Sequence, residues 1–421
     1  MGEVILLLKT IRISLYEGMK YLFTKNYTNL IRNLAKKLSK VNILYIKLIQ
    51  SISINENITD EVLIEELKEY TTNVSYENDE INYKLLENME KIELLENKKL
   101  KIDKKLPINA GMTALVFEGE IGDKKVIIKI LRNNFREKLE KSFKELEFVS
   151  KFFSKLPYIR KLNIKTLLNE NKKLILDQTD MKKEMKSIKL FQEKWKNIDY
   201  IQIPDIFPEY TNILSDGIVM EYINGKTINE IGEDNREKYA YMLAKFKFKS
   251  LFYDSVYHAD LHQGNILFLN DNNKEELKLG IIDYGIIGEL DREEQNDYFS
   301  FIKNLLNKEY EEIVCNEPEK FIKPLDIYNN LSVNKKKIIN NKMIEELRIV
   351  NEIDKIMGYK QLYRINSILK DYDLELKDNF CKMELALAIA EGVCKKLSKD
   401  KGFMDYVNDA YKEFLPDFML E

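Results

Sequence analysis

The first hundred residues carry apolar side chains at intervals of three or four, which is the spacing of one helix face. Thr59-Asp60-Glu61 is typical of a helix start, and an apolar face follows it over 60–70. The pattern then changes to two runs rich in β-branched residues, 114–121 and 125–131, joined at Gly122-Asp123. Because glycine accepts a positive φ at a tight turn, these runs predict a β-hairpin after a helical segment of about 100 residues.

Helical spacing returns from about Arg136 to Phe153 and from Asp180 to about Lys196. A strand-like run, 218–222, ends at Asn224-Gly225, and the chain beyond residue 226 is mostly helical. This order predicts an α+β fold with a helical extension (1–105), a small mixed lobe (106–225) and a larger helical lobe (226–421). The expected buried side of the second helix consists of Met181, Met185, Ile188, Phe191 and Trp195.

Composition excludes several classes of protein. A formal net charge of −3 argues against a protein that binds nucleic acid by charge alone. The three cysteines are widely spaced and form neither a metal motif nor a disulfide framework, so an intracellular, reducing compartment is favoured. No apolar run approaches the ~18 residues of a membrane helix, and none resembles a secretory signal. We expect a soluble or peripherally membrane-associated protein, and nothing in the composition indicates an oligomeric state.

Both histidines of the chain lie in one run, 257–267, which also contains Asp260 and Asn265. A second run, 281–285, places Asp283, an aromatic residue and a glycine after a short apolar strand. Asp-x-x-x-x-Asn followed by Asp-aromatic-Gly is the arrangement of kinase-like phosphoryl transfer. We expect Asp260 to accept or orient the proton of a nucleophile or a water. Asn265 and Asp283 are expected to hold Mg²⁺, which prefers hard oxygen ligands, and ATP is the predicted nucleotide.

Other parts of a phosphate site can be placed upstream. Lys129 ends the strand run Val-Ile-Ile-Lys, and kinases use a lysine there on the α- and β-phosphates. A cation on a strand needs a partner, and Glu184 on the helix after Asp180 is the best candidate. The small-residue loop before the hairpin can bring backbone N–H groups close to phosphate, and the segment before Gly225 lies where adenine would bind. The candidate nucleotide contacts are Ala110, Gly111, Met112, Thr113, Glu221 and Ile223.

Each of these signals has an ordinary structural explanation when taken alone. Val-Ile-Ile-Lys is a common strand ending, Asp-Tyr-Gly is a turn, and a helical carboxylate such as Glu184 is usually solvated. His258 and His262 are spaced like a zinc pair, but no cysteine or third histidine completes the site, although carboxylates could. The order and spacing of the whole set favour phosphoryl transfer, with both histidines as scaffold of the loop.

His-Ala-Asp-Leu-His-Gln-Gly-Asn (258–265) closely resembles the His-Ala-Asp-Pro-His-Pro-Gly-Asn signature of the UbiB/ADCK family of atypical kinases. The family's Lys-x-Gly-Gln motif is matched by Lys47 to Gln50, with Ile49 in place of glycine, and its alanine-rich loop is matched by 109–114. Gly111 stands where the family often has alanine, which loosens the loop. The resemblance covers nearly the whole chain. It implies a bilobal protein-kinase-like fold, ATP with Mg²⁺, and a gating element formed by Lys47 and Gln50.

The resemblance also bears on the substrate, because family members are linked to ubiquinone biosynthesis and lipid-related ATPase activity. Ala259 replaces the arginine of the His-Arg-Asp motif of protein kinases, and the short segment 285–291 leaves little platform for a peptide. We expect an atypical kinase or ATPase that serves isoprenoid-lipid metabolism, with a lipid or a peripheral membrane surface as partner. The rival hypotheses are a small-molecule phosphotransferase of the aminoglycoside or choline kinase type and a nucleotide-gated scaffold without turnover.

Overall fold

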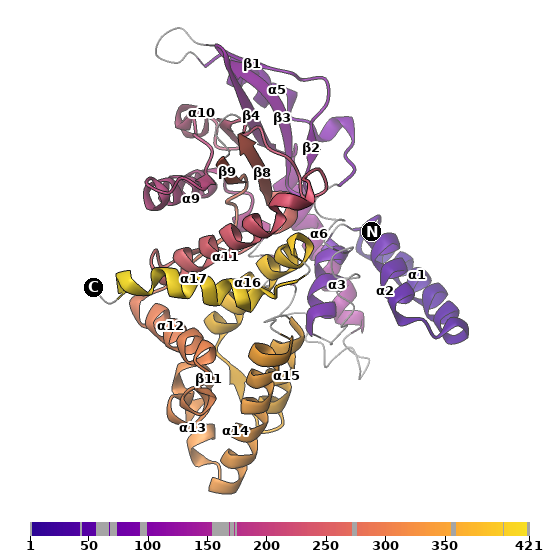
Figure 1. Ribbon diagram of the computed structural model, residues 1–421. Helices are drawn as coiled ribbons and strands as arrows, with labels where there is room; N and C mark the ends of the chain where they lie inside the picture. Colours follow the sequence, from indigo (N-terminus) through magenta and orange to yellow (C-terminus); the bar gives the residue numbers. More distant parts are fainter. Residues whose placement is uncertain are drawn as a thin grey trace. The chain divides into compact units, whose positions relative to one another are not determined.

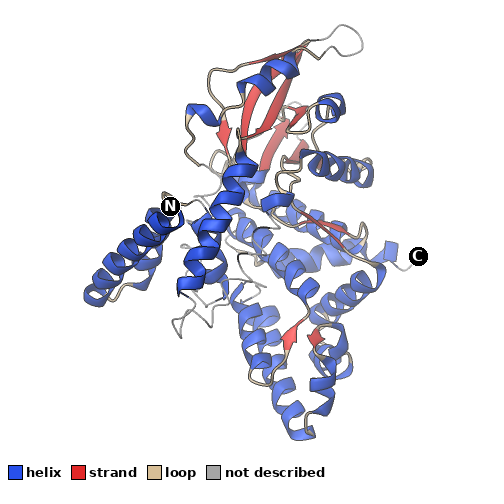
Figure 2. Cartoon of the chain, turned by 180° about the vertical axis from the view of Figure 1, so that it is seen from behind, coloured by secondary structure: helices blue, strands red, loops and turns tan. Residues whose placement is uncertain are grey.

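The computed structural model describes residues 2–42, 44–55, 67, 74–92, 99–153, 168, 172, 175–271, 276–354, 359–398 and 400–418. The chain forms two compact units: unit 1 is Met1–Lys186 with Asp205–Tyr222, and unit 2 is Ser187–Pro204 with Ile223–Glu421. Both units combine helices with small sheets (Figures 1 and 2), which confirms the predicted α+β class. The predicted helix 60–70 lies outside the described residues except for Leu67, and the division into three segments stays a prediction.

The sheet of unit 1 is antiparallel and follows the order β1-β3-β4-β6, with β2 paired to β3. Its central pair is the predicted hairpin, which turns at Gly122 with a φ of 61°. A turn with positive φ favours glycine because any side chain there would be strained. The strands are β1 (Leu100–Ile102), β2 (Asn109–Ala110), β3 (Ala114–Ile121), β4 (Lys124–Leu131) and β6 (Gly217–Glu221).

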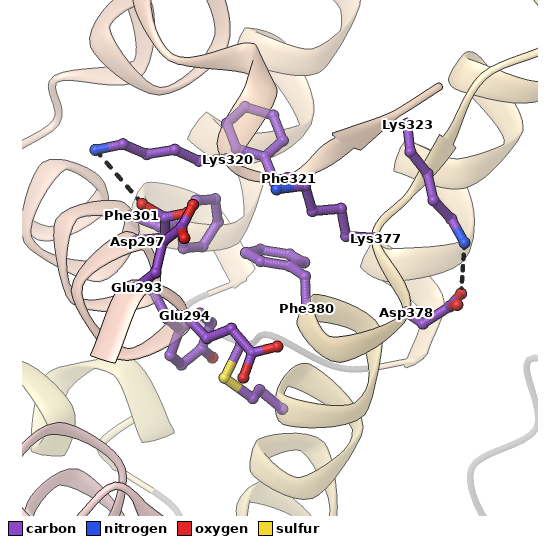
Figure 3. Close-up of a pocket in the computed structure, with 12 residues that line it drawn as sticks. Glu293, Glu294, Asp297, Phe301, Lys320, Phe321, Lys323, Lys377, Asp378 and Phe380 are labelled. Atoms are coloured by element: carbon purple, nitrogen blue, oxygen red, sulfur yellow. Dashed lines mark hydrogen bonds and ion pairs between the residues drawn. The ribbon is translucent and has the colours of Figure 1, made fainter. Parts of the chain in front are cut away.

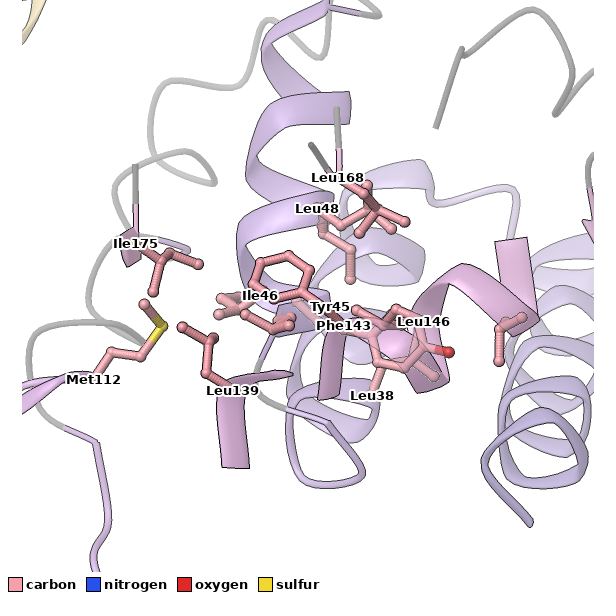
Figure 4. Packing of buried hydrophobic residues seen from close by; sticks show 14 of the residues in the cluster. Leu38, Tyr45, Ile46, Leu48, Met112, Leu139, Phe143, Leu146, Leu168 and Ile175 are labelled. Atoms are coloured by element: carbon pink, nitrogen blue, oxygen red, sulfur yellow. The ribbon is translucent and has the colours of Figure 1, made fainter. Parts of the chain in front are cut away.

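The helices of unit 1 bury two clusters of apolar side chains. One cluster joins the sheet to α5 and includes Leu86, Phe117 and Ile128. The other joins α2, α3 and α6 through residues such as Tyr45 and Phe143 (Figure 4). The helices are α1 (Gly2–Thr24), α2 (Tyr27–Ser39), α3 (Leu44–Asn55), α5 (Tyr83–Glu90), α6 (Phe135–Phe153) and α10 (Pro208–Ile213), with the 3₁₀ turn η1 (Asn78–Glu80). Helix was correctly predicted for α1, α2, α3, α5 and α6.

Helix α9 (Met181–Trp195) begins in unit 1 and continues into unit 2. All five side chains predicted for its buried side are at most 7% exposed, which confirms the helical spacing. Its start is fixed by Asp180, whose Oδ1 accepts hydrogen bonds of 3.0 Å from the backbone N–H groups of Lys182 and Lys183. Such a cap satisfies donors that the first helical turn leaves unpaired.

Unit 2 contains more β-structure than its mostly helical sequence pattern predicts. A three-stranded sheet has the order β5-β9-β8, and two strand pairs, β7 with β10 and β11 with β12, accompany it. The runs of β-structure are short, so apolar periodicity alone does not separate them from helix. The strands are β5 (Ile201–Gln202), β7 (Val256–His258), β8 (Ile266–Asp271), β9 (Glu276–Ile281), β10 (Ile287–Glu289), β11 (Ile322–Lys323) and β12 (Glu375–Leu376).

Helix α11 (Arg236–Phe252) is central to unit 2 and contacts α12, α16, α17, β7 and β9. A helix that packs on most of its sides must be apolar around most of its circumference, and α11 buries ten side chains. The other helices are α12 (Arg292–Leu306), α13 (Leu325–Asn330), α14 (Val333–Arg348), α15 (Tyr359–Lys370), α16 (Asp378–Leu397) and α17 (Phe403–Phe418). Short 3₁₀ turns are η2 (Glu233–Asn235), η3 (Gln263–Asn265) and η5 (Pro318–Lys320), and two π-helical segments are η4 (Glu312–Asn316) and η6 (Ile349–Asp354). Within the described part of the chain, no helix has an apolar stretch long enough for a membrane crossing.

Candidate functional site

In unit 1, Lys129 and Glu184 form a bidentate ion pair. The Nζ atom of Lys129 lies 2.7 Å from Oε1 and 3.0 Å from Oε2 of Glu184. Ile128 and Ile130 point into the core on one face of β4, so the alternation of a strand puts Lys129 on the other face. The Glu184 side chain is 2% exposed and that of Lys129 is 13% exposed. The predicted partner is therefore in contact with the lysine, and it holds a cation in place on the strand.

The loop before the hairpin is organised by Arg132, a residue that the sequence did not single out. Its guanidinium donates to the carbonyl of Gly111 at 2.8 and 3.0 Å, and to the carbonyls of Val74 and Ser75 at 3.1 and 3.2 Å. Glu80 pairs with it at 2.7 Å. Burial lowers the pKa of Arg132 from its ordinary value, while Glu80 opposes this effect. A buried guanidinium with all these partners fixes the path of the loop.

Four candidate nucleotide contacts belong to this loop. Ala110 is buried, and the side chain of Met112 packs into the helical core of unit 1. The N–H of Gly111 donates to the carbonyl of Ala114 at 2.9 Å. The Gly111 N–H group is therefore already used within the loop. A backbone contact from Gly111 or Met112 to a phosphate would have to use a different atom. Thr113 is half-buried and contributes a hydroxyl to the same loop.

In unit 2, Asn265 and Asp283 lie at the same end of a strand pair. Asn265 immediately precedes β8, and Asp283 follows β9 by two residues. Ile266 and Ile281 are directly opposite in the ladder, and the N–H of Ile282 donates to the carbonyl of Asn265 at 3.1 Å. Antiparallel pairing therefore brings together two residues that are 18 positions apart, because the start of one strand meets the end of the other.

The side chains of these two residues are oriented by local hydrogen bonds. Nδ2 of Asn265 donates to the carbonyl of Asp260 at 2.9 Å, which leaves Oδ1 as the end of the amide suited to a metal. Oδ1 of Asp283 accepts from the N–H of Gly285 at 2.9 Å. A carboxylate and an amide oxygen at one strand end match the ligand preference of Mg²⁺.

His258 connects the loop of Asp260 to the segment of Asp283. Its Nδ1 accepts from the N–H of Asp260 at 3.2 Å, so Nε2 carries the proton and donates to the carbonyl of Asp283 at 2.5 Å. Burial and the nearby charge of Lys247 lower the pKa of His258 to about 4. The imidazole is therefore neutral at physiological pH, with both nitrogens engaged. This arrangement excludes His258 as a zinc ligand and makes it the scaffold that the sequence predicted.

Asp260 and His262 occupy the more accessible part of the loop. The Asp260 side chain is 31% exposed, and His262 Nε2 lies 3.9 Å from its Oδ2. Nδ1 of His262 accepts from the N–H of Gly264 at 3.0 Å, which caps the short turn η3. The carboxylate of Asp260 is accessible, whereas its backbone is fixed on both sides by His258 and Asn265.

A buried lysine lies beneath this loop. Lys247, on α11, is 1% exposed, and its Nζ donates to the carbonyl of His258 at 2.5 Å. Burial lowers its pKa to about 7, and the charge of Asp260 acts in the opposite direction. The loop that contains Asp260 is thus supported by an amine that titrates near neutrality.

Tyr284 anchors the Asp-Tyr-Gly segment in the interior. The residue is fully buried, with its ring centroid 5.1 Å from that of Phe191 and 5.5 Å from that of His258. Burial raises the pKa of its hydroxyl well above the ordinary value. Aromatic packing on both sides holds the backbone that precedes Gly285 in one position.

The remaining candidates lie at the ends of other elements. Glu221 ends β6, and its Oε2 accepts from the N–H of Asp205 at 3.1 Å. Ile223 is 4% exposed and packs against Gly280 of β9. Lys47 is half-buried on α3, while the side chain of Gln50 lies outside the described residues.

Sequence reasoning missed Arg132 and Lys247. A signal existed for Arg132, because a cation three residues after Lys129 falls at the end of the same strand and beside the small-residue loop. For Lys247 no local signal existed: it is one of three lysines at alternate positions, with Lys245 and Lys249, and only packing distinguishes it.

A separate cavity of about 250 Å³ lies in unit 2 among α12, β11 and α16 (Figure 3). Phe301, Phe321 and Phe380 line it, and Lys323 pairs there with Asp378 at 2.8 Å. None of the predicted site residues lines this cavity.

Comparisons with known proteins bear on the family and the fold of the chain. The sequence profile described as "ABC1 atypical kinase-like domain" matches residues 79–316. The chain is similar to "Probable protein kinase UbiB" of Providencia stuartii, with 25% identity over 195 residues, which are 45% of this chain and 35% of the relative. It is also similar to the protein of the same name from Pasteurella multocida, with 22% identity over 311 residues, 72% of this chain and 57% of the relative. The chain therefore spans less than two thirds of the length of these relatives.

Among solved structures, the chain resembles Rv3197 from Mycobacterium tuberculosis, determined in complex with erythromycin. The TM-score is 0.52 at 16% identity, and the likeness covers 88% of this chain and 91% of that one. At this identity the likeness concerns the fold alone. Together with the profile match, it confirms the predicted kinase-like fold.

Proposed function

We propose, from the premise that this chain belongs to the ABC1 atypical kinase-like family (UbiB/ADCK), that it is an ATP- and Mg²⁺-dependent atypical kinase or ATPase. The observation that carries the proposal is the placement of Asn265 and Asp283 at one end of β8 and β9, with the Asn265 amide on the Asp260 carbonyl. Phosphoryl transfer needs oxygen ligands for a metal beside a carboxylate that orients the nucleophile. These three residues supply both.

Each residue has a distinct role in this proposal. Asn265 and Asp283 would hold Mg²⁺, which when bound neutralises charge on the phosphates. Asp260 accepts or orients the proton of the acceptor or of a water. The bidentate pair with Glu184 supports Lys129 as the cation for the α- and β-phosphates, because it holds the ammonium group in place.

We propose further contacts to the phosphates and to the adenine of the nucleotide. The loop from Ala110 to Thr113 would lie along the phosphates, with its path fixed by Arg132. Glu221 and Ile223, at the end of β6 and just beyond it, would contact adenine. The proposed helical extension, mixed lobe and helical lobe are 1–105, 106–225 and 226–421.

We propose that the protein acts in isoprenoid-lipid metabolism of the ubiquinone type. Its proposed partner is a lipid or a peripheral membrane surface. The segment after Gly285 supports this choice over an exposed peptide. It forms β10, which pairs with β7, and Asp291 then caps α12 directly. Lys47 and Gln50 are the proposed gating element.

The experiment is a measurement of ATP hydrolysis by the purified chain, with and without anionic-lipid vesicles or a phenolic additive. We expect turnover that requires Mg²⁺ and is lost in Asp260→Asn, and an altered response to the additives in Lys47→Ala. If nucleotide binds but turnover stays at background under every condition, the protein is a nucleotide-gated scaffold. Rapid transfer of phosphate to a small alcohol would instead identify a small-molecule phosphotransferase.

A further inference from the structure

The buried face of helix α1 holds two polar side chains beside the apolar Leu6. Thr10 and Glu17 are 4% and 2% exposed, respectively. The Thr10 hydroxyl shares a hydrogen bond of 2.5 Å with the hydroxyl of Tyr45 on α3, and Glu17 pairs with Lys37 of α2 at 2.5 Å. Together with the packing of α1 on α2 and α6, these contacts fix which face of α1 points inward. A surface helix ordinarily turns most of its apolar side chains inward, whereas α1 packs only Leu6 and the partly buried Leu7 and Ile13 into the core cluster.

The outward face of α1 is apolar. Of the 18 large apolar side chains exposed among the described residues, eight lie on this one helix, with exposed fractions between 48% and 90%. At 3.6 residues per turn they fall within about one third of the helix circumference and form a stripe along one side of the helix. The stripe consists of Val4, Ile5, Leu8, Leu15, Tyr16, Met19, Leu22 and Phe23. An exposed apolar stripe of this length marks an interaction surface.

The charge around the stripe is strongly positive. Among residues 2–42, Glu3 is the one exposed acidic side chain, because Glu17 is buried against Lys37. Arg12 lies within the stripe, and Lys9 and Lys20 lie along one edge of it. The exposed basic side chains of this segment are Lys9, Arg12, Lys20, Lys25, Lys36, Lys37 and Lys40. The chain as a whole carries a net charge of −3, so this basic cluster is local.

We infer that α1 docks in the plane of an anionic phospholipid membrane, with its apolar stripe at the boundary between headgroups and acyl chains. An apolar face bordered by lysine and arginine is the pattern of interfacial helices. Anionic lipids attract basic residues near the surface, which adds to the burial of the stripe. A second copy of this chain is a poorer occupant, because it would bring two basic clusters together.

Docking of this kind needs no membrane-spanning helix. α1 has 23 residues and is therefore about 35 Å long, enough to place the whole stripe on a flat surface. The inference rests on the membrane partner proposed above and assigns it to a surface of unit 1, but it does not depend on nucleotide or on Asp260.

The test is co-sedimentation of the full chain with vesicles of phosphatidylglycerol and phosphatidylcholine, compared with vesicles of phosphatidylcholine alone. We expect binding to the anionic vesicles that weakens with added salt and is much weaker on neutral vesicles. Leu8→Glu and Leu15→Glu should each weaken binding about tenfold, the loss expected for keeping one leucine out of the apolar layer. Both side chains are 62% exposed, so the melting temperature should not fall.

Ile213→Glu is the matched control, because Ile213 is 63% exposed in the same unit but lies on α10. It should bind vesicles like the wild type. Asp260→Asn should also bind normally while losing turnover, which separates this inference from the proposed function. The inference is overturned if the wild type does not bind anionic vesicles, or if Leu8→Glu and Ile213→Glu bind these vesicles equally well. A dimer that Leu8→Glu dissociates, without vesicle binding, would assign the stripe to a second copy.

Discussion

Replacing Lys247 with methionine should change how the stability of unit 2 depends on pH. Burial lowers the pKa of this lysine from 10.5 to about 7. Between pH 7 and pH 10.5, Lys247 is protonated in the unfolded chain but deprotonated in the folded chain. The unfolded state therefore binds more protons, and raising the pH stabilises the wild type. Methionine has no proton to release, so the variant lacks this contribution.

The size of the stability difference follows from the shift in the pKa of Lys247. Each pKa unit corresponds to about 1.4 kcal/mol, so the cost of the buried charge is roughly 5 kcal/mol below pH 7 and disappears near pH 10.5. The variant also loses the hydrogen bond to the His258 carbonyl, which costs about 1–3 kcal/mol at every pH. Lys247→Met should therefore be more stable than the wild type by about 2–4 kcal/mol at pH 6.5. From pH 7 to pH 9 the wild type should gain roughly 2–3 kcal/mol relative to the variant.

Urea unfolding followed by tryptophan fluorescence measures this directly. Trp195 is the single tryptophan, lies in unit 2, and packs 4.7 Å from Phe246 on the same helix as Lys247. The other titrating groups are present in both proteins, and those that Lys247 does not influence cancel in the difference. His258, whose pKa of about 4 is lowered in part by Lys247, titrates far below the interval from pH 7 to pH 9. Lys238→Met, an exposed position on α11, is the control and should show no such pH dependence. A difference between wild type and Lys247→Met that is flat or falls with pH would refute the reasoning.

Three other substitutions test the supports of the site. Glu184→Gln removes the ionic partner of Lys129 and should lower the unfolding free energy by about 3 kcal/mol in calorimetry and weaken ATP binding; unchanged affinity would contradict the role given to the pair. Arg132→Met leaves three backbone carbonyls without this donor and should cost about 3 kcal/mol. Arg136→Met loses a half-exposed ion pair and one hydrogen bond to the Thr179 carbonyl, and should cost less, about 1–2 kcal/mol. Gly111→Ala should raise stability by about 0.4–1 kcal/mol in the same experiment, because the added methyl meets one atom at 3.5 Å; a clear loss would show that the loop needs glycine.

The local features of the fold were predictable where the chemistry is local. Glycine at the turn defined the hairpin, and the apolar spacing of α9 placed Glu184 on a helix that starts just after Asp180. The pairing of Lys129 with Glu184 followed from the need of a strand cation for a partner. The run around Asp260 was predictable because its residue types and spacing are specific to one chemistry.

The features that depend on packing were not predictable. Lys245, Lys247 and Lys249 alternate along α11 and look alike in the sequence, yet Lys245 pairs with Glu413, Lys249 with Asp254, and only Lys247 is driven into the interior. The three-stranded sheet of unit 2 was not predicted, because its strands β5 and β9 pair with each other although they lie far apart in the sequence. Tertiary contacts, not periodicity, decide both cases.

The central claim is that Asn265 and Asp283 form a magnesium site for a nucleotide. The most direct test is the melting temperature of the wild type and of Asp283→Asn, each with ADP in the presence and absence of Mg²⁺. A ligand that binds only the folded state raises the melting temperature in proportion to its affinity. We predict a rise for the wild type that requires Mg²⁺ and is absent in Asp283→Asn. The same rise in both proteins, or no rise in the wild type, would contradict the claim.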